Sequence, residues 1–163
     1  MANFEYAQEI MDSLANGAFL TTASLGKVNT MTVSWGNIGL IWGKKIFTAM
    51  VRDTRYTKTA MENEMEFTVS IPTDDSLKSA LGICGSKSGR DMDKIKECDL
   101  ELIESETVMP PAVKCSGIVL ECKVLYKQRM DTAALAAEVK DKWYGDDNMH
   151  TMYYGEITNI KKL

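Results

Sequence analysis

Side chains of two kinds alternate between residues 29 and 36, and this run is the first feature that suggests binding chemistry. It reads Asn-Thr-Met-Thr-Val-Ser-Trp-Gly, so a strand here places the hydroxyls of Thr30, Thr32 and Ser34 on one face. Strand N–H groups and hydroxyls can hydrogen-bond the nitrogens and carbonyls of a heteroaromatic ring. The competing interpretation is a row that faces solvent on an antiparallel sheet, with Trp35 in the core on the other face.

Two arginines stand at the start of a predicted helix, in the segment 51–57. A helix N-terminus favours anions and does not itself favour arginine, so Arg52 and Arg55 there indicate a phosphate clamp. Arginine binds phosphate oxygens through two parallel N–H donors. The alternative is that Arg52, Arg55 and Thr57 are ordinary surface and helix-start residues. Together with the strand hydroxyls, the clamp predicts a flat polar cofactor that carries a phosphate.

The loop from Cys84 to Asp91 combines glycines, hydroxyls and two cations. Its glycines permit a close approach of the backbone to a ligand, and Lys87 or Arg90 can place positive charge beside a reduced ring. The alternative is a simple turn. Cys84 is predicted to be a small packed residue rather than a redox thiol.

The single histidine, His150, lies near the end of the chain. Histidine donates hydrogen bonds and changes charge near neutral pH, so one interpretation places it over the cofactor, where it helps to position a hydride donor. The other interpretation is a surface residue. Because the chain has one histidine and four cysteines without a C-x-x-C pair, we expect no metal site of the usual zinc spacing and predict reduced thiols.

The sequence lacks the common motifs for nucleotide and hydrolase chemistry. Its glycines at 36, 39 and 43 do not have the Rossmann spacing, and residues 82–89 lack the ending of a P-loop. No Gly-x-Ser-x-Gly elbow occurs. A nicotinamide dinucleotide would therefore bind by another route, as a transient partner.

Length and composition indicate one folded domain over residues 1–163. The chain is 45% hydrophobic and 26% charged, which is ordinary for a globular protein. The net charge of −4 and scattered cations give no support to nucleic-acid binding. Neither a bilayer-spanning apolar run nor a signal peptide is evident, so we expect no membrane partner and a cytoplasmic location.

The elements that must position these residues are mostly strands. Few βαβ alternations occur, so the sequence favours a mainly β fold, an antiparallel barrel with peripheral helices, because closure hides the sheet edges. The predicted strands are 18–24, 28–35, 38–42, 46–51, 66–71, 116–127 and 151–160, with a tight turn at 25–27. The predicted helices are 3–16, 54–64, 74 or 75 to 84, 91–98, and 131 or 132 to 143.

Four segments in this order resemble the flavin reductase-like family of FMN-binding split-barrel proteins, most closely its flavoredoxin-type branch. They are Asn29-Thr30-Met31-Thr32-Val33-Ser34-Trp35-Gly36, Val51-Arg52-Asp53-Thr54-Arg55-Tyr56-Thr57, Cys84-Gly85-Ser86-Lys87-Ser88-Gly89-Arg90-Asp91 and Tyr153-Tyr154-Gly155-Glu156-Ile157. The resemblance implies an antiparallel split barrel that forms a homodimer, with one FMN per subunit near the interface.

The resemblance also implies the cofactor site. The isoalloxazine would lie against residues 30–35, and the ribityl phosphate region would be held by Arg52, Arg55 and Thr57. Residues 86–89 would close over the flavin, with His150 near its open face. The FMN-binding residues expected on this basis are Asn29, Thr30, Met31, Thr32, Val33, Ser34, Trp35, Arg52, Arg55, Tyr56, Thr57, Cys84, Gly85, Ser86, Lys87, Ser88 and Gly89.

Three functions remain open at this point. The first is an FMN-dependent oxidoreductase, an NAD(P)H-dependent flavin or ferric reductase, in which the cofactor does the hydride chemistry. The second is a flavoredoxin-like carrier that passes electrons between protein partners. The third is a non-catalytic flavin-binding domain. The donor and acceptor are small molecules in the first case and proteins in the second.

Overall fold

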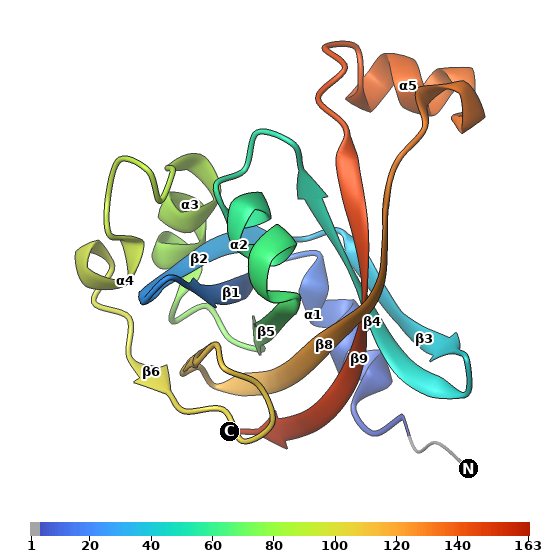
Figure 1. Ribbon diagram of the computed structural model, residues 1–163. Helices are drawn as coiled ribbons and strands as arrows, with labels where there is room; N and C mark the ends of the chain where they lie inside the picture. The colour runs from blue at the N-terminus through green and yellow to red at the C-terminus, as the bar shows by residue number, and fades with distance from the viewer. Residues whose placement is uncertain (1–3) are drawn as a thin grey trace.

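The computed structural model describes residues 4–163 as a mainly β protein with an antiparallel seven-stranded sheet in the order β2-β1-β5-β8-β9-β4-β3 (Figure 1). The strands of this sheet are β1 (Ala18–Ser24), β2 (Lys27–Val33), β3 (Gly36–Ile41), β4 (Lys44–Arg52), β5 (Glu66–Pro72), β8 (Gly117–Arg129) and β9 (His150–Lys162). A small second sheet pairs β6 (Leu102–Ile103) with β7 (Ala112–Val113). The predicted strands are thereby confirmed, with ends that move by up to two residues.

The helices lie around the sheet, as predicted (Figure 1). They are α1 (Ala7–Leu14), α2 (Thr57–Glu64), α3 (Lys78–Ser86), α4 (Lys94–Glu97) and α5 (Ala137–Trp143), with a 3-10 turn η1 (Thr132–Ala134). No helix among residues 4–163 is long and apolar enough to cross a membrane.

Two tight hairpins set the register of the outer strands. Leu25 and Gly26 join β1 to β2, and Trp42 and Gly43 join β3 to β4; all four have positive φ angles between 50° and 75°. Two successive positive φ angles give a turn whose twist matches that of antiparallel strands. The tight turn predicted at 25–27 is therefore confirmed, and the strand predicted from 38 ends before Trp42 because Trp42 is in the turn.

The long strands β8 and β9 run the length of the molecule and curve across it (Figure 1). Gly155 lies where β9 passes over the core, and a Cβ at this position would approach the Phe67 ring to 2.7 Å and Cys122 Cβ to 3.0 Å. Opposite it, the β8–β9 register shifts between Val124 and Tyr126. The missing side chain and the bulge together let the two strands bend around the core.

The main hydrophobic core lies between the sheet and α1. The helix contributes Ile10 and Leu14, and Gly17 follows it with a φ of 102°, as expected for a helix C-cap. A smaller cluster under α3 and α4 contains Phe19, Leu81 and Cys84. The loop of residues 86–89, the glycine loop, follows directly after the α3 residues of this second cluster.

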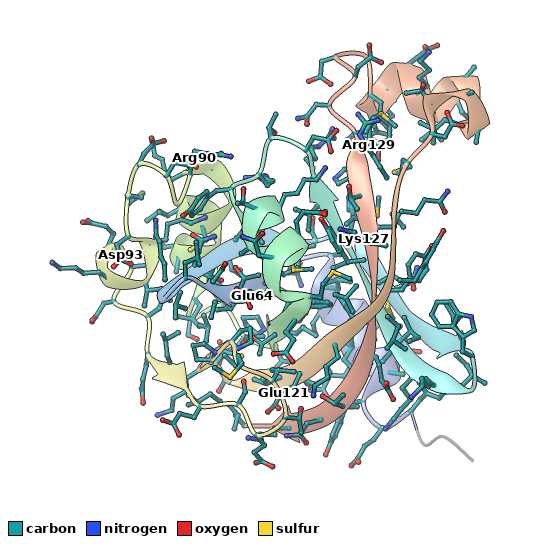
Figure 2. The ribbon with its side chains drawn as sticks, viewed as in Figure 1. Glu64, Arg90, Asp93, Glu121, Lys127 and Arg129 are labelled. Atoms are coloured by element: carbon teal, nitrogen blue, oxygen red, sulfur yellow. The ribbon has the colours of Figure 1, made fainter. Side chains whose placement is uncertain are left out.

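A buried carboxylate fastens the loop between β6 and β7 to the barrel. Glu121 on β8 (Figure 2) accepts hydrogen bonds from the backbone N–H groups of Glu106 and Thr107, the Thr107 hydroxyl and the Asn159 amide, at 2.7–3.1 Å. Lys161 Nζ lies 3.7 Å away. Burial opposes its ionisation, but these hydrogen bonds outweigh burial and lower the pKa of Glu121. The carboxylate is thus fully satisfied by the protein.

Several predicted helix ends are wrong. The helix expected from residue 74 or 75 begins at Lys78, because the Asp74 carboxylate accepts from Ser76 instead of capping α3. The helix expected from residue 54 begins at Thr57, so both arginines precede it. The helix expected over 91–98 is only α4, capped by Asp93. For the helix expected over 3–16, the start at residue 3 lies outside the described residues.

The alanine-rich helix predicted from 131 or 132 to 143 is divided in two. Leu135 and Ala136 adopt extended backbone angles between η1 and α5, which interrupts the helix. None of the residues of α5 is buried, and α5 stands away from the barrel at the top of Figure 1.

Candidate functional site

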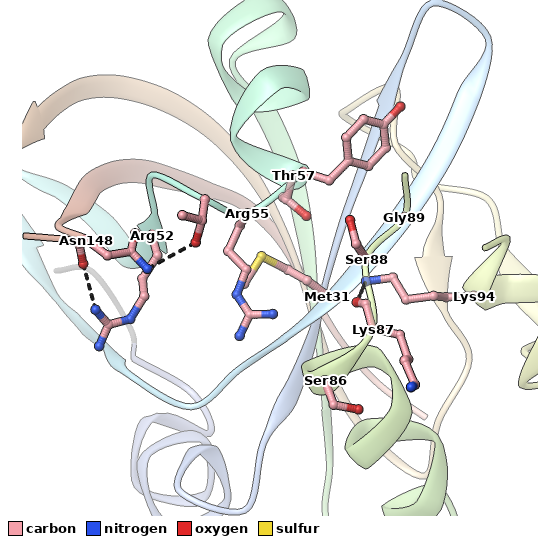
Figure 3. Close-up of a pocket in the computed structure, with 12 residues that line it drawn as sticks. Met31, Arg52, Arg55, Thr57, Ser86, Lys87, Ser88, Gly89, Lys94 and Asn148 are labelled. Carbon is pink, nitrogen blue, oxygen red and sulfur yellow. Dashed lines mark hydrogen bonds between the residues drawn. The ribbon is translucent and has the colours of Figure 1, made fainter. Parts of the chain in front are cut away.

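A cation-rich cavity of about 230 Å³ lies between α3, the segment before α2 and the start of α4 (Figure 3). Four of its lining residues are cationic, and no aspartate or glutamate of residues 4–163 lines it. Its lining residues are Met31, Arg52, Thr54, Arg55, Tyr56, Thr57, Ser86, Lys87, Ser88, Gly89, Lys94 and Asn148. Cations and hydroxyls without a carboxylate are the donor set that a phosphate requires.

Arg55 occupies the middle of the cation-rich cavity (Figure 3). Its Nη1 donates to the Gly85 carbonyl at 2.8 Å, which holds the guanidinium against the end of α3. Burial first, and then the charge of Arg52, lower the pKa of Arg55. A guanidinium that is partly desolvated beside a second cation gains stability from a bound anion.

Arg52 is used differently from Arg55. Its Nη1 donates to the Asn148 carbonyl at 2.6 Å and its Nη2 to the Trp143 carbonyl at 3.2 Å, and it stacks over the ring of Tyr144. Figure 3 shows it turned toward Asn148. Arg52 therefore ties the end of β4 to the segment between α5 and β9, and fewer of its donors remain for a ligand.

Lys94 is a cation of this cavity that the sequence analysis missed. It is 4% exposed, and its Nζ donates to the carbonyls of Cys84 and Lys87 at 3.2 and 3.3 Å. Burial lowers its pKa. The sequence did contain a signal, because Asp93 is a helix N-cap residue that places Lys94 at the start of α4, close to the glycine loop.

The glycine loop packs tightly on β2. A Cβ at Gly89 would lie 2.1 Å from Asn29 Oδ1 and 2.7 Å from Tyr56 Cδ1, so only glycine fits there. Lys27 Nζ donates to the Gly89 carbonyl at 2.7 Å, and Asn29 Nδ2 donates to the Thr57 hydroxyl at 3.0 Å. Asn29, expected to contact the cofactor, instead braces the loop and the start of α2.

The hydroxyls of Thr30 and Thr32, in the middle of β2, are both bonded to neighbouring parts of the fold. Thr30 is fully buried, and its hydroxyl is held by Thr21 at 3.0 Å and by the Leu20 carbonyl at 3.2 Å. The Thr32 hydroxyl donates to the Leu81 carbonyl of α3 at 2.6 Å. The Thr30 hydroxyl is therefore used within the fold, and contact of this strand with a ring stays a prediction.

The end of β2 and the residues that follow it contribute to a second cavity of about 250 Å³, the aromatic cavity. Trp35 and Trp143 meet there at nearly right angles, with ring centroids 4.8 Å apart, and His150 lies 5.5 Å from Trp35. The lining residues are Met31, Thr32, Val33, Ser34, Trp35, Met50, Arg52, Arg55, Trp143 and His150. The two cavities share Met31, Arg52 and Arg55 and thus adjoin.

His150 is buried at the start of β9, opposite Arg52 of β4. Its Nδ1 lies 2.7 Å from the Tyr144 hydroxyl. Burial, together with the charges of Arg52 and Arg55, lowers the pKa of His150 to about 4. The imidazole is therefore neutral at pH 7, and the surface interpretation of this residue is wrong.

Most of the predicted site residues meet at these cavities. Asn29, Thr30, Cys84 and Gly85 line neither, while Met50, Thr54, Lys94, Trp143 and Asn148 line one and were not predicted. Cys84 packs beneath the loop, where burial and the neighbouring Cys98 raise the pKa of its thiol to about 12. A thiol that remains protonated in the smaller core is a packed residue, as predicted.

Known proteins resemble this chain in sequence and fold. Residues 11–161 match the family described as "Flavin reductase like domain". An uncharacterized protein of Archaeoglobus fulgidus is 29% identical over 142 residues, which cover 87% of this chain and 70% of that protein.

Two solved structures share the fold at low sequence identity. The flavoredoxin of Desulfovibrio vulgaris (Miyazaki F) has a TM-score of 0.71 and 20% identity, over 90% of this chain and 69% of that chain. An FMN-binding domain of a flavin reductase-like enzyme from Shewanella baltica OS155 has a TM-score of 0.70 and 18% identity, over 98% of this chain and 74% of that chain. The predicted fold class, an antiparallel split barrel with peripheral helices, is confirmed.

Proposed function

Because this chain belongs to the flavin reductase-like domain family, we propose that it binds FMN and acts as an oxidoreductase. The observation that carries the proposal is the pair of adjoining cavities. One is cationic, with no carboxylate of the described residues 4–163 in its lining, and the other is walled by aromatic rings. FMN has a matching construction, with a phosphate at one end and a flat ring system at the other.

The cation-rich cavity fits the phosphate. Arg55 and Lys94 supply charge. The Ser88 hydroxyl, which accepts from the Arg90 N–H, has its own proton to donate from the loop after α3. Each charge-assisted hydrogen bond contributes roughly 1.5–3 kcal/mol. These contacts come from segments joined only by the tertiary fold, since Arg55 is bonded to Gly85, thirty positions along the chain.

The aromatic cavity fits the ring system. Met31 and Val33 offer apolar surface on one side, and Trp35 closes another. Each cavity alone is smaller than the ~300–1,000 Å³ typical of ligand sites, and Met31, Arg52 and Arg55 line both, so an elongated ligand would span the two.

FMN, when bound, supplies the capacity to accept a hydride and release electrons. The chain supplies the binding and the electrostatics. Arg52 and Arg55 place two positive charges between the cavities, where they favour the negative charge of a reduced flavin. His150 and Trp143 border the aromatic cavity and limit its exposure to water.

The specific reaction we propose is NAD(P)H-dependent reduction of a free flavin or a ferric compound. NADH or NADPH would be a transient partner, since the chain has no Rossmann fingerprint to retain it. The aromatic cavity leaves an approach to the ring that a small planar donor can use.

A second candidate is an electron carrier between proteins, which an exposed aromatic cluster favours. Trp42 is 59% exposed and Tyr126 is 43% exposed, and both contact Tyr154 on the outer face of β3, β8 and β9. Exposed aromatic surface of this kind is typical of protein contacts.

We also propose a homodimer. In the single chain α5 has no buried residue, although Trp143 at its end borders the aromatic cavity. Contact with a second copy would cover α5 and protect that cavity. Sedimentation equilibrium at several concentrations measures the mass; a monomer of 18.2 kDa at every concentration contradicts the dimer.

The decisive experiment is a visible spectrum of the purified protein followed by anaerobic titration with NADH and NADPH. A reductase shows a flavin spectrum that bleaches with one nucleotide. A carrier shows the same spectrum and stays oxidised. A colourless protein that neither FMN nor riboflavin reconstitutes contradicts both.

A further inference from the structure

Tyr144 holds the only histidine of the chain through a short hydrogen bond. It directly follows α5, and its phenol oxygen lies 2.7 Å from His150 Nδ1. Both residues are buried, at 2% and 6% exposure, and their rings meet edge to face. Tyr144 lines neither cavity, so it acts on a ligand only through His150.

The direction of this hydrogen bond follows from the two acceptors within reach of Tyr144. The phenol has one proton, and its oxygen lies 2.7 Å from Nδ1 and 3.4 Å from Met130 Sδ. An unprotonated imidazole nitrogen accepts hydrogen bonds better than a thioether sulfur, which is a weak acceptor. Tyr144 therefore donates to Nδ1, and the imidazole proton is on Nε2.

The surrounding charges keep the pair neutral. Arg52 faces His150 from β4 and Arg55 faces it from the segment before α2, while Asp53 is the carboxylate that opposes them. Asp53 is itself paired with Lys58 and Arg129. Burial raises the pKa of Tyr144, so its phenol keeps the proton that it donates.

Nε2 is the ring nitrogen that remains for a ligand. It has no hydrogen-bond partner among residues 4–163, and it is not one of the side-chain polar atoms buried without a partner. His150 lines the aromatic cavity between Trp35 and Trp143. A neutral N–H in such a place is suited to an oxygen acceptor on a planar ligand.

We propose that Tyr144 is a positioning residue that fixes His150 as the neutral Nε2–H tautomer, so that the imidazole donates a hydrogen bond to a carbonyl-type oxygen of a planar ligand that approaches the flavin ring at the aromatic cavity. The role of the ligand rests on the proposed function, in which it is the electron donor or acceptor of the flavin. The tautomer rests on the protein alone.

The tautomer is measured directly by ¹H–¹⁵N correlation NMR, because a single histidine gives one set of ring signals. In the FMN-loaded full chain at pH 7 we expect a protonated Nε2 and an unprotonated Nδ1. A protonated Nδ1 overturns the proposal, since Tyr144 would then donate to Met130. A protein with the Nε2–H signal that fails to bind FMN contradicts the proposed function and leaves the tautomer standing.

Tyr144→Phe tests the consequence for the ligand, with Tyr153→Phe as the matched control. Tyr153 is also buried on the β9 side, but its hydroxyl donates to Glu62, away from both cavities. Tyr144→Phe should shift the Nδ1 resonance and raise the KM of the nucleotide that bleaches the flavin by about tenfold, the value of one hydrogen bond, with the Kd of FMN unchanged.

Tyr153→Phe should leave the Nδ1 resonance and the KM unchanged. Identical histidine nitrogen shifts in the two variants overturn the proposal whether or not either nucleotide reduces the flavin. Equal thermal midpoints for the two variants show that the difference in KM is not a difference in folding.

Discussion

Two polar clusters of this protein hold charge in opposite ways. Glu121 is a buried anion whose oxygens accept from two backbone N–H groups, a hydroxyl and an amide, with Lys161 close by. Arg55 and Lys94 are cations at a cavity that no carboxylate of residues 4–163 lines, and they donate mainly to carbonyl oxygens.

The difference separates structure from function. At Glu121 the protein satisfies its own charge, so the cluster can only stabilise the fold. The charged groups of Arg55 and Lys94 are partly removed from water without a counter-anion, and this burial lowers both pKa values. Cations without a counter-anion would be stabilised by an anionic ligand, so this cluster is suited to binding and the Glu121 cluster is not.

The largest effect is expected from Glu121→Ala. It leaves the half-buried donors of Thr107 and Asn159 without their buried acceptor, and breaking a buried charged network costs about 3–5 kcal/mol. Urea denaturation measures the free energy of unfolding, and the FMN affinity of the folded protein should not change. Glu101→Ala is the control, because its pair with Lys114 is exposed and contributes at most about 1 kcal/mol. A loss below the control would show that the Glu121 cluster is not structural.

His150 should make the protein less stable as the pH falls from about 6.5 to about 4. Its pKa is 6.5 in the unfolded chain and about 4 in the folded one, so the unfolded state binds the proton first and gains stability across that window. At about 1.4 kcal/mol for each pKa unit, the loss approaches about 3 kcal/mol at pH 4.

The control for this pH effect is His150→Asn, which removes the titrating group and keeps a small polar side chain. The difference in unfolding free energy between the two proteins should change by that amount between pH 7 and pH 4. A difference that is constant with pH would mean that neither burial nor the nearby cations lower the pKa of His150.

Arg55→Met should weaken FMN binding by about 1.5–3 kcal/mol and leave riboflavin binding unchanged, because riboflavin has no phosphate. Flavin fluorescence quenching gives both dissociation constants. Arg90→Met is the matched control, since Arg90 is exposed and lines neither cavity. Equal losses for FMN and riboflavin would place Arg55 at the ring and not at the phosphate.

The smallest effect is expected from Lys161→Met. Lys161 lies 3.7 Å from Glu121, but its side chain is 26% exposed, so its removal should cost at most about 1 kcal/mol of unfolding free energy. A loss as large as that of Glu121→Ala would show that the lysine, and not the hydrogen bonds, satisfies the carboxylate.

Much of the fold was predictable from short-range patterns. Hydrophobic alternation located the seven strands of the large sheet, and Leu25-Gly26 marked a turn that accepts positive φ. The helix ends were not predictable, since Asp74 has the right side chain for a cap but bonds to Ser76. Local propensity is the same for both arrangements, and packing chooses between them.

The residues of the candidate site were also predictable only in part. The segments around Arg55 and Ser86 were found because their residue types suit a phosphate, while Trp143 and Asn148 were missed because nothing in their immediate neighbours indicates a site. Lys94 was missed although Asp93 marks a helix start beside it, because a cap residue does not show which cavity the next side chain lines. The assignment of residues 1–163 to one domain remains a prediction.

The sequence by itself determined which residues share a face of β2, because side chains alternate along a strand. Only the tertiary structure decided which of these positions reach a cavity. The Thr30 hydroxyl is enclosed by Thr21 of β1 and the Leu20 carbonyl, and the Thr32 hydroxyl donates to the Leu81 carbonyl, 49 residues away, whereas Met31, Thr32 and Ser34 all line the aromatic cavity. Packing brings such distant partners together, and a local sequence pattern therefore cannot predict their hydrogen bonds.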